Sequence, residues 1–181
     1  LNLPQIPRNT SPQKAAEILR DYWKIGNKPI DDIVYLVESN GLIVTDFATS
    51  TGDVDAFSHK IVCGEKETYL IGYSQNKKTA ARIHFDIAHE LGHILLHNWN
   101  EDLENIDKED FKDIEQEAHS FASAFLLPEK EFSDDVRPYA TNLAYYAELK
   151  KRWKVSIAAM IRRAKDLWII SNDDYSKLMR N

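Results

Sequence analysis

AHELGHILLH, residues 88–97, places three histidines and one glutamate within a run of apolar side chains. The spacing of leucine and isoleucine in this run predicts a helix that is buried on one face. Ionisable side chains are costly to bury unless they are paired or bind a metal. The stretch therefore predicts a helix at the centre of the fold that also carries a chemical site.

His89, Glu90 and His93 form the pattern H-E-x-x-H. Positions i and i+4 share one helix face, so both imidazoles can reach one ion at about 2.0–2.1 Å. Glu90 lies beside them, where it can take a proton from water at the ion. The alternative is that both histidines are satisfied core residues and Glu90 is a surface acid. The position of the pattern within a helix, soon after a strand, favours a catalytic metal site.

A catalytic site of this kind needs a third protein ligand. His97 lies about 12 Å along the helix axis from His89, too far for one ion to bind both. We expect His97 to orient a neighbouring group or to pack near the helix end. The third ligand is then an acid from a second helix.

The segment 114–128, IEQEAHSFASAFLLP, contains the candidate acids. Glu117 stands one turn from both Ile114 and Phe121, on the side expected to face inward, where a dication would offset its burial. Glu115 forms an i,i+4 pair with His119 nearer the flank and is a weaker candidate. The alternative is that Glu117 is a boundary acid on an acidic helix.

The flanking sequence predicts an α+β fold with a small, mostly antiparallel sheet of three strands. Helical periodicity and capping signals predict the helices, and segments rich in β-branched and aromatic residues predict the strands. The expected helices cover 12–23, 29–40, 77 to about 98, 114–128 and, in two pieces that break near 153–156, 141–168. The expected strands are LIVTDF (42–47), FSHKIVC (57–63) and TYLIGYS (68–74).

Composition fits one folded unit of 181 residues with a net charge of −6. No apolar stretch approaches the roughly 20 residues that cross a bilayer, so we expect no membrane partner. The first residues, LNLPQIPRNTSP, lack the pattern of an export signal. The single cysteine, Cys63, fits a reducing compartment. We therefore expect a cytoplasmic location.

AHELGH at 88–93, followed by EQEAHSFASAFLLP at 115–128, resembles the ImmA/IrrE family of metallopeptidases. The resemblance covers nearly the whole chain. It includes YWKIG (22–26), PIDDIVYLVESNGLIV (29–44), DAFSHK (55–60) and LKKRWKVSIAAMIRRAKDLWII (149–170). Two departures are His84-Phe85-Asp86, where the family often has Arg-Phe-Thr, and His119, where it usually has asparagine.

The resemblance implies a zincin-like metallopeptidase core over 1–140 and a helical, helix-turn-helix-like subdomain over 141–181. It implies His89 and His93 as zinc ligands, Glu117 as the third ligand and Glu90 as the general base. Two imidazoles and one carboxylate also accept Mn²⁺ or Fe²⁺. The implied partner is a protein substrate, a helix-turn-helix repressor of a phage, mobile element or stress regulon.

Sequence alone leaves the oxyanion donor open among His119, Tyr139, Tyr145 and Tyr146. The strand at 68–74 precedes the metal helix, so its edge is expected to align an extended substrate by strand addition.

The competing function is a DNA-binding or metal-sensing module that cleaves nothing unaided. A helix capped by Ser156 carries Arg162, Arg163 and Lys165, and exposed bases after a short turn can contact phosphates. The acidic net charge and the apolar residues of the same helix favour a supporting subdomain over direct binding of DNA.

Overall fold

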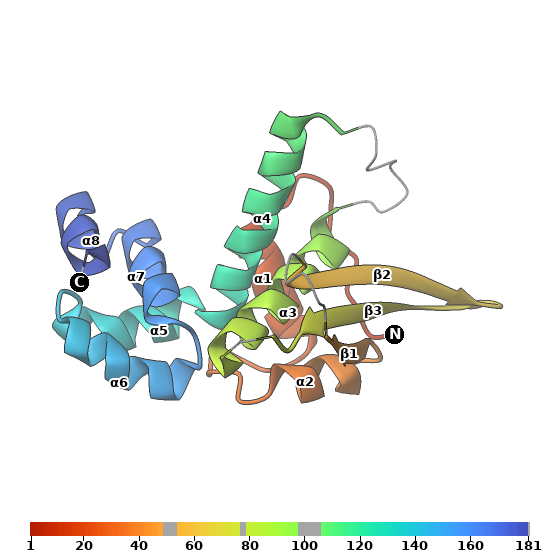
Figure 1. The fold of residues 1–181 in the computed structure, drawn as a ribbon, viewed down its shortest axis with the longest axis horizontal. Coiled ribbons are helices and arrows are strands. Elements are labelled where there is room, and N and C mark those ends of the chain that lie inside the picture. The colour runs from red at the N-terminus through yellow and green to blue at the C-terminus, as the bar shows by residue number, and fades with distance from the viewer. Residues whose placement is uncertain (49–53, 77–78, 98–105, 181) are drawn as a thin grey trace.

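Figure 1 shows the computed structural model of the chain, which describes residues 1–48, 54–76, 79–97 and 106–180. Within these ranges the fold is α+β, as the sequence predicts. The elements are α1 (Pro12–Tyr22), α2 (Ile33–Ser39), β1 (Ile43–Phe47), β2 (Ala56–Cys63), β3 (Lys66–Ser74), α3 (Ala80–Leu96), α4 (Lys108–Leu126), α5 (Glu129–Val136), the 3₁₀ turn η2 (Arg137–Tyr139), α6 (Leu143–Trp153), α7 (Ile157–Asp166) and α8 (Asn172–Met179).

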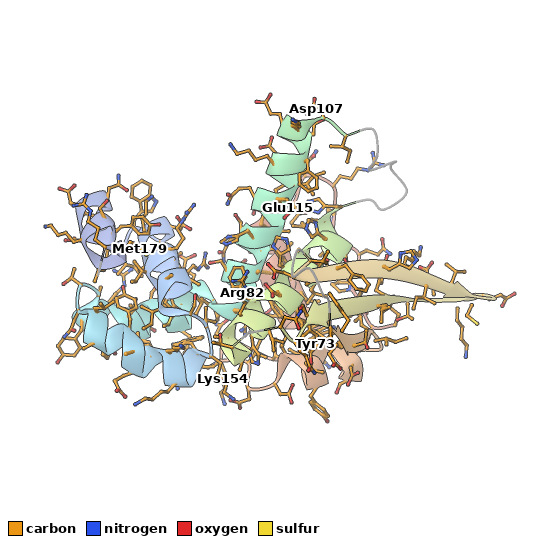
Figure 2. The ribbon with its side chains drawn as sticks, viewed as in Figure 1. Tyr73, Arg82, Asp107, Glu115, Lys154 and Met179 are labelled. Carbon is orange, nitrogen blue, oxygen red and sulfur yellow. The ribbon has the colours of Figure 1, made fainter. Side chains whose placement is uncertain are left out.

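Capping side chains account for the helix starts that differ from the prediction. The α2 helix begins later than expected because Asp32 caps it, accepting a hydrogen bond from the Tyr35 amide. The α4 helix begins earlier because Asp107 accepts from two amides of its first turn. Figure 2 shows Asp107 at this start and Glu115 further along the same helix. Residues 77, 78 and 98 of the helix expected from 77 to about 98 lie outside the described ranges. The sequence analysis did not predict α5 and α8.

The sheet has the strand order β1-β3-β2. The longer pairing, β2 with β3, is antiparallel, and the shorter, β1 with β3, is parallel. Because β3 is paired on both sides, the prediction that the strand at 68–74 offers its edge to a substrate is wrong. Among the described strands, β1 and β2 form the two edges.

The α3 helix, which carries His89, Glu90 and His93, lies between the sheet and α4, and α1 packs on α4 (Figure 1). Ile87 and Leu91 point into this interior and are fully buried. Burying an aliphatic side chain of this size contributes roughly 1.5–3 kcal/mol each. The packing of these side chains in the interior therefore determines which face of α3 remains available for a functional site.

Two buried arginines join neighbouring helices to the C-terminal end of α4. Arg20 of α1 donates through Nε to the Phe125 carbonyl at 2.7 Å. Arg163 of α7 donates through Nε to the Leu127 carbonyl at 3.0 Å. Positive groups at a helix C-terminus satisfy free carbonyls and complement the helix dipole. The sequence analysis expected Arg163 to be exposed, and this is wrong, because its exposed fraction is 6%.

The C-terminal helices lie to one side of the sheet (Figure 1). Met160 and Ile161 of α7 belong to the same hydrophobic cluster as Ile87 and Leu91 of α3. The division into a core over 1–140 and a subdomain over 141–181 stays a prediction.

Candidate metal centre

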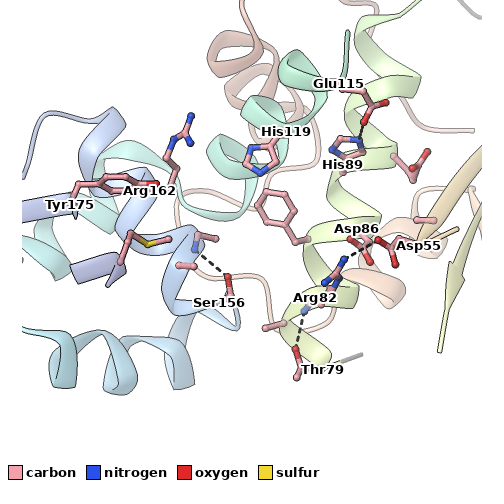
Figure 3. A pocket seen from close by; sticks show the side chains of 17 residues that line it. Asp55, Thr79, Arg82, Asp86, His89, Glu115, His119, Ser156, Arg162 and Tyr175 are labelled. Atoms are coloured by element: carbon pink, nitrogen blue, oxygen red, sulfur yellow. Dashed lines mark hydrogen bonds and ion pairs between the residues drawn. The ribbon is translucent and has the colours of Figure 1, made fainter. Parts of the chain in front are cut away.

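The α3 helix carries His89 and His93 one turn apart, and His89 lines a cavity (Figure 3). Thr79 caps the helix by accepting from the Arg82 amide, which sets its first turn. His93 is 6% exposed, and the Nε2 atoms of the two imidazoles lie 3.0 Å apart. Two ring nitrogens this close stabilise each other only through a shared proton or a cation. The two nitrogens therefore share a hydrogen bond or bind a cation at this point.

Gly92 lets α4 approach α3 closely at this level. A Cβ atom at Gly92 would lie 3.0 Å from Cδ1 of Phe121 and 3.2 Å from the Ala118 backbone. Any residue larger than glycine at this position would therefore push the two helices apart. This close contact brings the side chain of Glu115, one turn before Ala118, to the imidazoles.

Glu115 completes a cluster of three groups. Its Oε2 lies 3.3 Å from Nε2 of His89, and its Oε1 lies 3.1 Å from Nε2 of His93. One ligand atom from each of the three residues lies within 4.8 Å of the others. The structure thus brings two imidazoles and one carboxylate to one point.

Glu117, the acid favoured by the sequence analysis, lies elsewhere. Its side chain is 54% exposed, and its Oε2 lies 3.2 Å from Nε2 of His97 rather than beside His89 or His93. Successive helical residues are about 100° apart, so residues 115 and 117 face nearly opposite directions. Because Glu115 aligns with Ala118 on the contact face, Glu117 turns outward.

Small residues were the signal that could have identified Glu115. Gly92 on one helix and Ala118 and Ala122 on the other mark where two helices touch, since small side chains allow close packing. Glu115 stands three and seven residues before those alanines. The sequence analysis used the larger Ile114 and Phe121 instead.

The environment keeps the two histidines neutral and therefore able to offer a lone pair. Burial lowers the pKa of His89, and burial together with its histidine neighbours lowers the pKa of His93 to about 3. Neutral imidazole is the form that binds metals.

Glu90 is 7% exposed and faces the same cavity. Ser58 of β2 donates a hydrogen bond from Oγ to Oε2 of Glu90 at 2.7 Å. Burial raises the pKa of Glu90 to about 7; the Ser58 hydrogen bond opposes this rise and the Glu115 charge adds to it. A carboxyl group with a pKa near neutrality suits proton transfer. Sequence reasoning missed Ser58, because its contact crosses from a strand to a helix.

The cavity has a volume of about 880 Å³. His89 and Glu115 lie on one side, and α7 and α8 contribute Arg162 and Tyr175 on the other (Figure 3). Glu90 and Met179 also line the cavity. Ala56 places the start of edge strand β2 at the same cavity. The arrangement offers room for a chain segment beside the three converging groups.

The cavity also distinguishes the four candidate oxyanion donors. His119 lines it, across from His89 in Figure 3. The hydroxyl groups of Tyr145 and Tyr146 donate to the carbonyls of Asp135 and Ala140, away from the cluster. Tyr139 is 60% exposed and does not line the cavity. His119 is therefore the candidate that the geometry retains.

The features expected of a DNA-binding surface are not assembled on α7. Arg163 is bound to Leu127 and to Gln13, Arg162 pairs with Asp166, and Lys165 lies over the ring of Tyr175.

Among the described residues, no helix combines the length and apolar character that a membrane span requires.

Comparison with known proteins agrees with the geometry. The model of the IrrE N-terminal-like domain family, Peptidase_M78, matches residues 40–165. The matched range includes the two histidines, Glu90 and both candidate acids of α4. No curated protein matches the chain significantly. The family match covers well over half of the chain, which therefore belongs to the IrrE N-terminal-like, or Peptidase_M78, family of metallopeptidases.

Proposed function

We propose that the chain is a zinc-dependent endopeptidase with His89, His93 and Glu115 as metal ligands and Glu90 as general base. The convergence of two Nε2 atoms and a carboxylate at 3.0–3.3 Å is the observation that carries the proposal. Glu115 replaces Glu117 in the proposed ligand set, because α4 turns Glu117 towards His97.

The donor set fits a dication. Ligand atoms at ordinary zinc distances in a tetrahedral site lie about 3.4 Å apart, close to the separations observed here. The residues leave one side of the cluster open to the cavity, as a catalytic zinc site requires. The same donors accept Mn²⁺ or Fe²⁺, so the preference for zinc rests on the family resemblance.

A bound dication supplies Lewis acidity, polarising the scissile carbonyl and acidifying water. Glu90 accepts the proton released by the attacking water and delivers it to the leaving amine. Ser58 holds the carboxylate of Glu90 in place for both transfers. His119 is proposed to donate an N–H hydrogen bond to the oxygen that becomes negative as the carbonyl is attacked.

An extended peptide is the proposed form of the substrate. The edge of β2 reaches the cavity at Ala56, and Ser58 on the same strand contacts Glu90. A substrate strand added to this edge would present its backbone near the cluster. We propose a helix-turn-helix repressor as the protein cleaved, on the strength of the family resemblance, and a cytoplasmic setting, in which exposed Cys63 stays reduced.

The rival, a regulator that binds DNA or metal without cleavage, receives less support, because Arg163 is buried and donates a hydrogen bond to the Leu127 carbonyl.

The proposed peptidase activity is tested by cleavage of an unfolded protein by the zinc-loaded chain and by Glu90→Gln, followed by mass spectrometry of the products. We expect the variant to retain zinc and lose cleavage. Equal cleavage by both chains would refute the assignment of Glu90, and zinc binding without cleavage by the wild type would favour the rival.

A further inference from the structure

We infer that His97 and Glu117 form a hydrogen-bonded chain that fixes the tautomer and orientation of His93, which makes them positioning residues for the metal. The inference rests on the proposed function, because it assumes that His93 binds the metal through Nε2. It also assigns a role to Glu117, which the sequence analysis proposed as a metal ligand.

The chain of contacts is continuous from α4 to the cluster. Nδ1 of His93 lies 2.9 Å from Nδ1 of His97, and Nε2 of His97 lies 3.2 Å from Oε2 of Glu117. The three groups thus form a row that starts at an exposed carboxylate and ends at a buried imidazole. His97 itself is held at the end of α3, where its amide donates to the His93 carbonyl at 3.0 Å.

Only one placement of protons satisfies every member of this row when a metal is bound. A ligating Nε2 carries no proton, so His93 must carry its proton on Nδ1. That N–H donates to Nδ1 of His97 when this His97 nitrogen carries no proton. His97 then carries its proton on Nε2 and donates it to the Glu117 carboxylate.

Solvent exposure differs along the row in a way that suits this role. The side chain of His97 is 12% exposed, against 8% for His93 and 54% for Glu117. The inner hydrogen bond is therefore shielded from competing water, whereas the outer carboxylate keeps its hydration. Outer partners that orient a ligating histidine typically change metal affinity by roughly 10- to 100-fold.

Four substitutions separate this role from others. His97→Phe removes the acceptor for the His93 N–H, and His97→Gln restores an acceptor oxygen of similar reach. Glu117→Ala removes the outer carboxylate. Asp113→Ala is the matched control, since it removes an exposed acid from the same helix without touching the row.

The experiment measures the zinc dissociation constant of each variant by competition with a chromogenic chelator. We expect His97→Phe to bind zinc roughly 10- to 100-fold more weakly, Glu117→Ala to show a smaller loss, and His97→Gln to recover most of the affinity. Asp113→Ala should match the wild type. Circular dichroism of the metal-free chains checks that each variant folds. If His97→Phe does not fold, the zinc affinity of Glu117→Ala tests the inference.

A second readout follows the protons directly. Long-range ¹H–¹⁵N NMR of the zinc-loaded protein should show His97 protonated on Nε2 and unprotonated on Nδ1. A His97 protonated on Nδ1, or zinc affinities of His97→Phe and Glu117→Ala equal to that of the wild type, would overturn the inference. Equal zinc binding by the wild type and His93→Ala would instead refute the metal site, so the two failures are distinguishable.

Discussion

Replacing Gly92 with alanine tests how the approach of two helices builds the metal cluster. The added Cβ would meet Phe121 at 3.0 Å and the Ala118 backbone at 3.2 Å, whereas ordinary contact begins near 3.4 Å. Phe121 is fully buried, and a backbone atom cannot rotate away, so α4 has to move by a few tenths of an ångström. Overpacking of this kind costs about 1–3 kcal/mol. Alanine recovers about 0.8–1 kcal/mol of helix propensity relative to glycine.

We therefore expect Gly92→Ala to lower the free energy of unfolding of the metal-free chain by up to about 2 kcal/mol, measured by urea denaturation. Zinc affinity should fall as well, because moving α4 draws Glu115 away from imidazoles now 3.1–3.3 Å from it. Ala122→Gly, on the same contact face, separates loss of packing from displacement of α4. A Gly92→Ala chain that is more stable by the full propensity gain and binds zinc unchanged would refute this reasoning.

Three further substitutions test individual contacts. Ser58→Ala removes the hydrogen bond to Glu90, so we expect kcat to fall roughly 10-fold, equivalent to about 1.4 kcal/mol. Zinc affinity should not change. An unchanged kcat would contradict the positioning role of Ser58. Arg163→Met leaves the Leu127 carbonyl without its buried donor, so we expect the free energy of unfolding, measured in urea, to fall by about 2–3 kcal/mol. A loss of DNA binding with no loss of stability would instead support the rival function. Burial raises the pKa of Tyr146 to about 12, so above about pH 10 the unfolded chain releases this proton before the folded chain does, and stability falls as pH rises towards 12. Tyr146→Phe should flatten that part of the stability profile, and an equally steep profile in the variant would argue against a buried phenol.

The sequence predicted the fold class, the strands and the helix that carries His89 and His93, because each rests on local periodicity, propensity and capping. H-E-x-x-H predicted from helix geometry alone that His89 and His93 share one face, and their Nε2 atoms do lie 3.0 Å apart. The third acid depended on which face of α4 meets α3, a tertiary property. Large apolar residues suggested Glu117, whereas the actual contact runs through Gly92 and the alanines in line with Glu115.

Features that join distant segments were beyond local reasoning. The Ser58–Glu90 hydrogen bond depends on the position of β2 at the sheet edge, and the order β1-β3-β2 cannot be inferred from strand propensities. Arg163 has the sequence context of an exposed base, but packing of α7 on α4 buries it against a helix terminus. In each case tertiary packing decided the outcome.

Anomalous diffraction at the zinc edge from crystals of the zinc-loaded protein tests the central claim most directly. We predict one strong peak about 2.0–2.2 Å from Nε2 of His89, Nε2 of His93 and a carboxylate oxygen of Glu115. Glu117 should remain beside His97 in the same crystals. A peak bound by Glu117 in place of Glu115, or no peak at the two imidazoles, would contradict the account.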